Sequence, residues 1–125
     1  MDDPLAFVIE DDEAHLELFS EALQKARFKV ETFRDGQAAL FQLTQTIPAL
    51  VILDLHLPHV SGADILSYIR SDPRLKSTWV VLASADPHMA SLLREKADLV
   101  LIKPISYFQL RELAARLRAS DPPHP

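Results

Sequence analysis

Four short apolar segments of this chain each end at a polar residue that can take part in chemistry. The segments span 5–9, 50–53, 79–83 and 99–102, and they are followed by Glu10 and Asp11, by Asp54, by Ser84 and by Lys103. Continuous apolar runs of this length are typical of strands buried on both faces of a parallel sheet. The carboxyl ends of parallel strands lie along one edge, where ligands bind in open α/β sheets. We therefore expect these polar side chains to meet in one pocket.

The chemistry of such a pocket follows from its crowded carboxylates. Neighbouring carboxylates raise one another's pKa, and a hard divalent cation relieves their repulsion. Magnesium prefers oxygen ligands and is usually held by one or two carboxylates together with a substrate phosphate. The five histidines of the chain have no spacing that resembles a zinc signature. The residues thus predict a magnesium-dependent phosphoryl site.

Asp54 is the candidate nucleophile of this site. With a metal ion bridging the oxygens, a carboxylate can attack phosphorus and form an aspartyl phosphate. Lys103 would supply a positive charge for a phosphoryl oxygen, and Ser84 would supply a hydroxyl donor. Asp11 and Asp12 also have a purely structural interpretation, because carboxylates commonly cap the positive end of a helix.

The segments between the apolar runs have the three- and four-residue apolar spacing of helices. The pattern predicts strands over 5–10, 28–33, 50–54, 78–83 and 98–103, and helices over 13–26, 36–46, 62–71, 87–97 and 107–119. Five such units predict an α/β fold, a doubly wound five-stranded parallel sheet with helices on both faces. Segment 28–33 alternates only partly, which suits an edge strand, and this favours the flavodoxin-like order 2-1-3-4-5.

Length and composition limit the function classes. The 125 residues predict one domain over 1–119, and the proline-rich 120–125 predicts a tail or the start of a linker. Two glycines 26 residues apart cannot form a P-loop or a dinucleotide fingerprint. The net charge of −5 argues against direct nucleic-acid binding. Without cysteine, a long apolar stretch or a signal peptide, we expect a cytoplasmic protein that does not enter membranes.

Taken together, these residues resemble the receiver domains of two-component response regulators, of the chemotaxis-regulator type. The resemblance spans about residues 5–119. Its motifs are the acidic pair Glu10-Asp11, the segment from Asp54 to Gly62, Ser84-Ala85 and Lys103-Pro104, in the order and at the spacing of the family.

The resemblance implies a role for each motif residue. Asp54 would be the phosphoacceptor, and a histidine kinase or phosphotransfer protein would be the donor. Mg²⁺ would be bound by Asp54, by Asp11, by Glu10 through water and by the backbone carbonyl of His56. Ser84 would move toward the phosphoryl group, and Lys103 would contact it. The Lys103-Pro104 bond is expected to be cis, an uncommon state for X-Pro bonds.

The chain departs from the family pattern near its last strand. Where many receivers carry an aromatic residue three positions before the lysine, this chain has Val100, and the neighbouring, often acidic position is Leu99. Either Ser84 pulls the following loop directly, or Leu99 and Val100 belong to an apolar partner surface, or Val100 simply fills the space of the ring. That surface would be formed by 87–97, 98–103 and 107–119, and a homodimer is left open.

Two other functions remain as alternatives. A receiver-like adaptor would bind proteins without being phosphorylated, and the altered segment at Leu99 and Val100 favours it. A phosphohydrolase would need a second acid two residues after the nucleophile, where this chain has His56. We therefore expect a signalling phosphoacceptor and not an enzyme. The imidazole of His56 is either an inert loop side chain or a group that sets the lifetime of the aspartyl phosphate.

Overall fold

The apolar runs of the sequence form the central strands of one parallel sheet in the computed structural model, which describes residues 2–123. The strands are β1 (Leu5–Ile9), β2 (Lys29–Phe33), β3 (Leu50–Asp54), β4 (Trp79–Ser84) and β5 (Leu99–Ile102). They are all parallel and lie in the order β2-β1-β3-β4-β5. The predicted fold class and strand order are confirmed, with β2 at one edge.

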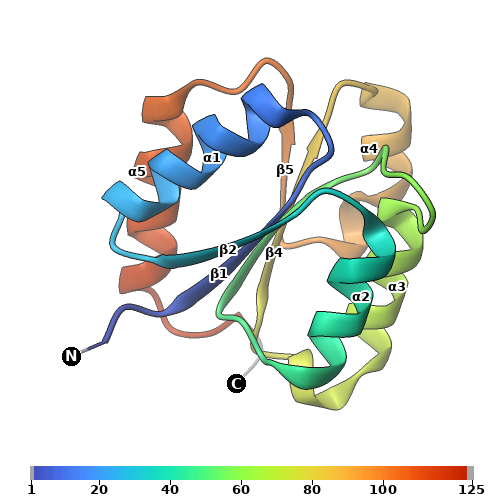
Figure 1. Cartoon of the computed structure of the whole chain (residues 1–125), viewed down its shortest axis with the longest axis horizontal. Helices are drawn as coiled ribbons and strands as arrows, with labels where there is room; N and C mark the ends of the chain where they lie inside the picture. Colours follow the sequence, from blue (N-terminus) through green and yellow to red (C-terminus); the bar gives the residue numbers. More distant parts are fainter. Residues whose placement is uncertain (1, 124–125) are drawn as a thin grey trace.

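Two layers of helices cover the sheet. The helices are α1 (Glu13–Lys25), α2 (Gly36–Gln45), α3 (Gly62–Ser71), α4 (Pro87–Leu93) and α5 (Tyr107–Ala119), and two 3₁₀ turns span Pro73–Leu75 and Arg94–Lys96. Figure 1 shows α1 and α5 on one face and α2, α3 and α4 on the other. Among residues 2–123, every helix is too short or too polar to span a lipid bilayer.

Each face of the sheet has its own apolar core because side chains alternate along a strand. Val8 and Val81 pack under α1 and α5 in one cluster. Phe7, Leu53 and Leu82 pack under α2 and α3 in the other. All five residues of β3 are buried, as expected for a central strand covered on both faces.

The strand β5 differs from the prediction that each apolar run is buried on both faces. Leu99 and Ile102 are 36% and 41% exposed. The strand lies at the second edge of the sheet, next to β4 only, and the helix before it is short. The run therefore forms a strand, but a half-covered one.

The helix predicted over 87–97 is shorter than expected. It ends at Leu93, and the chain tightens into the 3₁₀ turn Arg94–Lys96. Arg70 of α3 donates hydrogen bonds to the carbonyl of Lys96 and to the carboxylate of Asp98. The Asp98 carboxylate also accepts the N–H of Val80 at 2.8 Å, so these contacts hold the turn against α3 and β4.

The other predicted boundaries agree within two residues. Ser61 and Ser106 cap α3 and α5 through their side-chain oxygens, each of which accepts the backbone N–H three residues further on. The Lys103-Pro104 peptide bond is cis, as expected. Of the tail predicted over 120–125, positions 124–125 lie outside the described residues.

Candidate phosphoryl site

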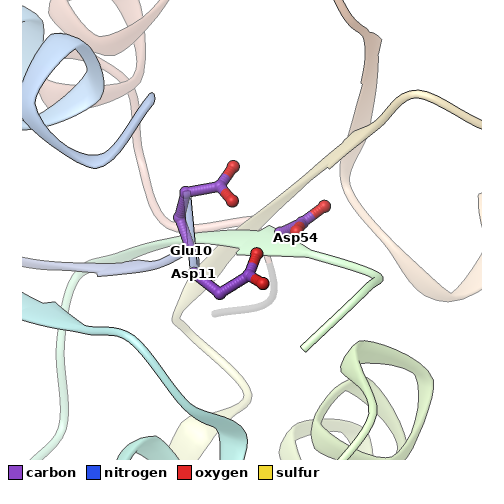
Figure 2. Close-up of side chains that lie close together, drawn as sticks. All are labelled: Glu10, Asp11 and Asp54. Carbon is purple, nitrogen blue, oxygen red and sulfur yellow. The ribbon is translucent and has the colours of Figure 1, made fainter. Parts of the chain in front are cut away.

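Three carboxylates meet at the carboxyl ends of β1 and β3. Glu10 and Asp11 follow β1, and Asp54 is the last residue of β3. Oxygen atoms of the three side chains lie within 4.8 Å of one another, and Figure 2 shows them gathered at the two strand ends. Glu10 and Asp54 are only 1% and 4% exposed, whereas Asp11 is exposed. The predicted convergence of these carboxylates is thus present in the structure.

Lys103 reaches the same pocket from the end of β5, the edge strand opposite β2. Its backbone N–H donates to the carbonyl of Ser84 at 2.8 Å, which joins the end of β5 to the end of β4. Its Nζ donates to Glu10 Oε1 at 2.7 Å and lies 3.5 Å from Asp54 Oδ1. One mostly buried ammonium group therefore contacts two of the three carboxylates, which leaves an excess of negative charge in the cluster.

Burial and neighbouring charges shift the pKa values of both Glu10 and Lys103. Burial raises the pKa of the Glu10 carboxyl, and the charge of Asp54 adds to the rise, while Lys103 and the N–H of Asp12 oppose it. Burial by itself would lower the pKa of Lys103, but its hydrogen bond to Glu10 and the charge of Asp54 raise it, and the balance is a raised pKa. Lys103 therefore stays charged in the pocket, and a further cation would relieve the remaining repulsion.

A divalent cation fits this donor set. Carboxylate oxygens are the hard ligands that Mg²⁺ prefers, and two of the three carboxylates are taken out of water, which favours a counter-ion. Glu10, Asp11 and Asp54 are the residues that could hold such an ion.

The capping interpretation holds for Asp12. Its side chain accepts the N–H of His15 at 3.1 Å at the start of α1, and its own N–H donates to Glu10 Oε2 at 3.1 Å. Asp11 points into the carboxylate cluster instead (Figure 2). Asp12 is therefore the capping residue of α1, and Asp11 belongs to the carboxylate cluster.

Ser84 ends β4 with a fully buried side chain. Its hydroxyl accepts the N–H of Asp86 at 3.0 Å and lies 3.2 Å from the carbonyl of Asp86. The carboxylate of Asp86 in turn caps α4 by accepting the N–H groups of His88 and Met89. In this state the hydroxyl is bound to the loop that leads into α4.

The loop after Asp54 is held by a close backbone approach at Gly62. The N–H of Gly62 donates to the carbonyl of Leu55 at 3.2 Å. Within this loop His56 is exposed.

Arg34 is a residue of this edge that the sequence reasoning missed. It follows β2, and its guanidinium donates to the carbonyl of Asp11 at 3.4 Å. Arg34 is a polar residue at a strand end, as Asp54 and Lys103 are. Its strand end is harder to recognise in the sequence because segment 28–33 is not continuously apolar.

Comparison with known proteins shows that this chain is similar to response regulators. Residues 6–117 match the family described as response regulator receiver domain. The chain is 31% identical to the probable methanogenesis regulatory protein FilR2 of Methanothrix harundinacea, over 94% of this chain and 83% of that protein. It is 33% identical to the transcriptional regulatory protein PrrA of Mycobacterium leprae, over 93% of this chain but only 49% of PrrA.

Solved structures agree with the sequence relatives. The signal receiver domain of a protein described as a putative LuxO repressor, from Vibrio parahaemolyticus, superimposes with a TM-score of 0.83 at 27% identity, covering 94% of this chain and 91% of that one. The response regulator TrrA of Thermotoga maritima, solved in complex with Mg²⁺-BeF, gives a TM-score of 0.80 at 29% identity, covering 91% and 98%. The protein is therefore a member of the response regulator receiver domain family of two-component systems.

Proposed function

We propose that Asp54 accepts a phosphoryl group from a histidine kinase or phosphotransfer protein, and that the modification changes which partners the domain binds. The observation that carries the proposal is the buried Asp54 carboxylate, flanked by Glu10 and Asp11 and facing the Lys103 ammonium. An oxygen of Asp54 would form the new bond to phosphorus. The bond from phosphorus to the donor imidazole nitrogen would break, and its electron pair would stay on that nitrogen.

The remaining residues would serve this transfer as follows. Bound Mg²⁺ would neutralise the charge on the transferring phosphoryl oxygens. Asp11, Asp54 and the carbonyl of His56 would contact the ion directly, and Glu10 would contact it through water. Lys103 would bind a phosphoryl oxygen as a point charge. Ser84 would exchange its hydrogen bonds with Asp86 for one to the phosphoryl group.

The exchange at Ser84 is the step that would move the protein. Releasing the Ser84 hydroxyl frees the N–H of Asp86, the residue whose carboxylate caps α4. The phosphoryl group carries about −1.5 to −2 charge at neutral pH and replaces the single negative charge of the Asp54 carboxylate, which places more negative charge nearer Ser84 and can bias two arrangements of such a loop. We infer that the β4–α4 loop carries the signal, while Val100 packs against the apolar cluster that contains Phe7, Leu53 and Leu82.

The surface formed by α4, β5 and α5 is our candidate for the downstream partner. Three large apolar side chains are exposed on α4 and β5, namely Leu92, Leu99 and Ile102. Exposed apolar surface that is contiguous is typical of protein interaction sites, and this is the chemistry that the proposal assigns to the surface. The partner at this surface could be a second copy of the chain. In that case gel filtration of the isolated protein should show a dimer after phosphorylation, whereas a different partner would leave it monomeric.

We further infer that residues 1–119 constitute one receiver domain and that 120–125 is a tail or the start of a linker. The family match over 6–117 is consistent with this division. The chain spans about half the length of PrrA. The proposal therefore concerns the receiver domain, and it assigns no activity to a longer protein.

The test is incubation with a small acyl phosphate or phosphoramidate and Mg²⁺, followed by intact mass measurement. Wild type should gain the mass of one phosphoryl group, and Asp54→Asn should gain none. Asp64→Asn, which alters an exposed carboxylate in the first turn of α3, is the matched control and should behave as wild type. An unmodified wild type, or an adduct on Asp54→Asn, would contradict the proposal. The first result would favour a receiver-like adaptor.

A further inference from the structure

The outer edge of β2 has no neighbouring strand among residues 2–123. Lys29 donates its backbone N–H, and Phe33 offers its carbonyl, to the residues that flank β1, so both direct their backbone groups toward β1. Successive residues of a strand direct these groups to opposite sides, and those of Val30 and Thr32 therefore point away from the sheet. Two N–H and two C=O groups along this edge are available to an added strand.

A groove of about 520 Å³ runs between this edge and α1, which lies beside β2 in Figure 1. The strand contributes Thr32 and Arg34 to its lining, and the helix contributes Glu13, Glu17 and Glu21. The three glutamates are exposed and recur every four residues, a spacing of about 6 Å along a helix. Alternate residues of a strand are about 6.6 Å apart, so every second side chain of an added strand would face one glutamate.

The charge of the groove selects among the strands that could occupy it. Arg34 is the one cation among the described residues that line the groove, and its guanidinium already donates to the carbonyl of Asp11 at 3.4 Å. Three carboxylates and one guanidinium leave an excess of negative charge. A second copy of this chain, with its net charge of −5, would bring an acidic groove of its own. Charge complementarity therefore favours a basic segment over a second β2 strand.

An unsatisfied acceptor on β2 points to the same kind of occupant. Glu31 lies between Val30 and Thr32, with its side chain on the opposite face of the strand. Its Oε2 atom is shielded from solvent and accepts no hydrogen bond from the described residues, which is unfavourable for a buried acceptor. Cross-strand neighbours have Cβ atoms about 5 Å apart, so a basic residue opposite Glu31 on an added strand would supply the donor.

We propose that the outer edge of β2 is a docking site for an extended basic segment of another protein. The segment adds to the sheet as a sixth strand, and its backbone pairs with Val30 and Thr32. Alternate lysine or arginine side chains lie against the glutamates of α1, and one on the other face reaches Glu31. In such strand addition, backbone hydrogen bonds give affinity and side-chain contacts give specificity. The inference goes beyond the proposed function and holds whether or not Asp54 is phosphorylated.

The first test titrates the ¹⁵N-labelled protein with the acetylated and amidated peptide KVKRKVK at low ionic strength, followed by NMR. The amide signals of Val30 and Thr32 should shift, and their hydrogen exchange should slow at least about fivefold. The control is the same peptide methylated on every backbone nitrogen, which keeps the charges but donates no backbone hydrogen bond. It should bind at least about tenfold more weakly. Equal affinity of the two peptides, shifts confined to another part of the protein, or no binding would overturn the proposal.

The second test changes the protein, with the folding of each variant checked by circular dichroism. Thr32→Pro removes an outward N–H at an edge-strand position where proline is tolerated, and should weaken the peptide at least about tenfold. Thr32→Val keeps the N–H and should change the affinity less than about twofold. Equal affinities of these two variants would overturn the proposal, and the methylated peptide decides the case in which Thr32→Pro does not fold.

The contribution of the glutamates is tested in the same titration. The double variant Glu17→Gln/Glu21→Gln should weaken the peptide at least about threefold. Its control is Glu95→Gln/Glu112→Gln, which makes the same change in net charge at exposed positions outside the groove. Equal effects of the two double variants would overturn the proposal, because the peptide would then respond to net charge alone.

Sedimentation without peptide tests a second copy as the occupant. Wild type and Thr32→Pro should sediment alike, because two acidic grooves repel one another. A wild-type dimer that Thr32→Pro dissociates would assign the edge to a second copy and overturn the proposal.

Discussion

Gly62 packs directly against the backbone of Asp54, so that a Cβ atom at Gly62 would lie 2.3 Å from the Asp54 carbonyl oxygen. The first residue of α3 thus touches the strand end that carries the candidate phosphoacceptor. The requirement for glycine here is one of space, because its φ angle is not positive. The start of α3 and the position of Asp54 are therefore coupled by backbone contact alone.

Replacing Gly62 with alanine should cost about 2–3 kcal/mol of unfolding free energy, because neither the strand nor the helix can retreat from the clash without losing packing. Urea unfolding followed by the fluorescence of the single tryptophan, Trp79, measures it. The neighbouring change Ala63→Gly alters helix propensity alone and should cost about 1 kcal/mol. Equal losses in the two variants would show that the close approach is not limiting.

Arg27 occupies a position where glycine is usual. Its φ is 72°, and the N–H groups of Arg27 and Phe28 bond to the carbonyls of Gln24 and Leu23, which is the hydrogen-bond pattern of a Schellman cap after α1. Arg27→Gly should therefore stabilise the protein by up to about 1 kcal/mol, because glycine adopts this conformation without a steric penalty.

The matched control for Arg27→Gly is Lys25→Gly. Lys25 lies in the last turn of α1, where glycine has no conformational advantage and should destabilise by about 1 kcal/mol. Urea midpoints of the two variants should move in opposite directions. A destabilised Arg27→Gly would mean that the arginine side chain makes a contribution larger than the backbone strain.

The carboxylate cluster should reduce stability when no divalent cation is bound. Asp54→Asn removes one of three mutually repelling charges and should stabilise the protein by about 1 kcal/mol in the presence of a chelator. Mg²⁺ should stabilise wild type with rising concentration, since it binds the folded state, and should stabilise Asp54→Asn much less. Asp121→Asn, at an exposed position, should leave both values unchanged. A wild type whose stability is independent of Mg²⁺ would contradict this expectation.

The contribution of Glu10 to the free energy of unfolding should depend on pH in the opposite sense to that of an acidic residue whose pKa is lowered by folding. Its pKa is raised above 4.5 by burial, so the folded protein takes up this proton before the unfolded chain does as the pH falls. The contribution of Glu10 to stability is therefore complete below about pH 4.5 and is lost as the pH rises through the raised pKa. A carbon NMR titration of its carboxyl group without divalent cations measures the midpoint. Asp54→Asn should lower that midpoint, and a wild-type midpoint at or below 4.5 would refute the prediction.

A phosphoryl analogue should perturb the loop that Ser84 holds. Addition of beryllofluoride with Mg²⁺ should shift the amide NMR signals of residues 84–96, because the hydroxyl of Ser84 would release the N–H of Asp86. Ser84→Ala should confine the shifts to the neighbours of Asp54. If the wild-type shifts are also confined there, the β4–α4 loop does not carry the signal.

Much of this structure is local enough to be predicted from the chain. The caps at Ser61 and Ser106 depend on a side chain and a backbone N–H three residues away, so spacing is sufficient to find them. The end of α4 at Leu93 was not predictable in this way. It depends on Arg70, which reaches the carbonyl of Lys96 from a different helix, and helical spacing contains no information about that contact.

Which residues share the pocket can be predicted from the chain alone, because apolar runs become parallel strands and parallel strands end along one edge. Glu10, Asp54 and Lys103 follow from that rule, with no knowledge of distances. How the charged groups of these three residues pair with one another is visible only in the folded protein. The Lys103 ammonium lies 2.7 Å from a carboxylate oxygen of Glu10, 93 positions away in the chain, and 3.5 Å from the nearer oxygen of Asp54. That choice depends on side-chain length, burial and the fixed backbone at the end of β5, which exist only once the sheet has formed.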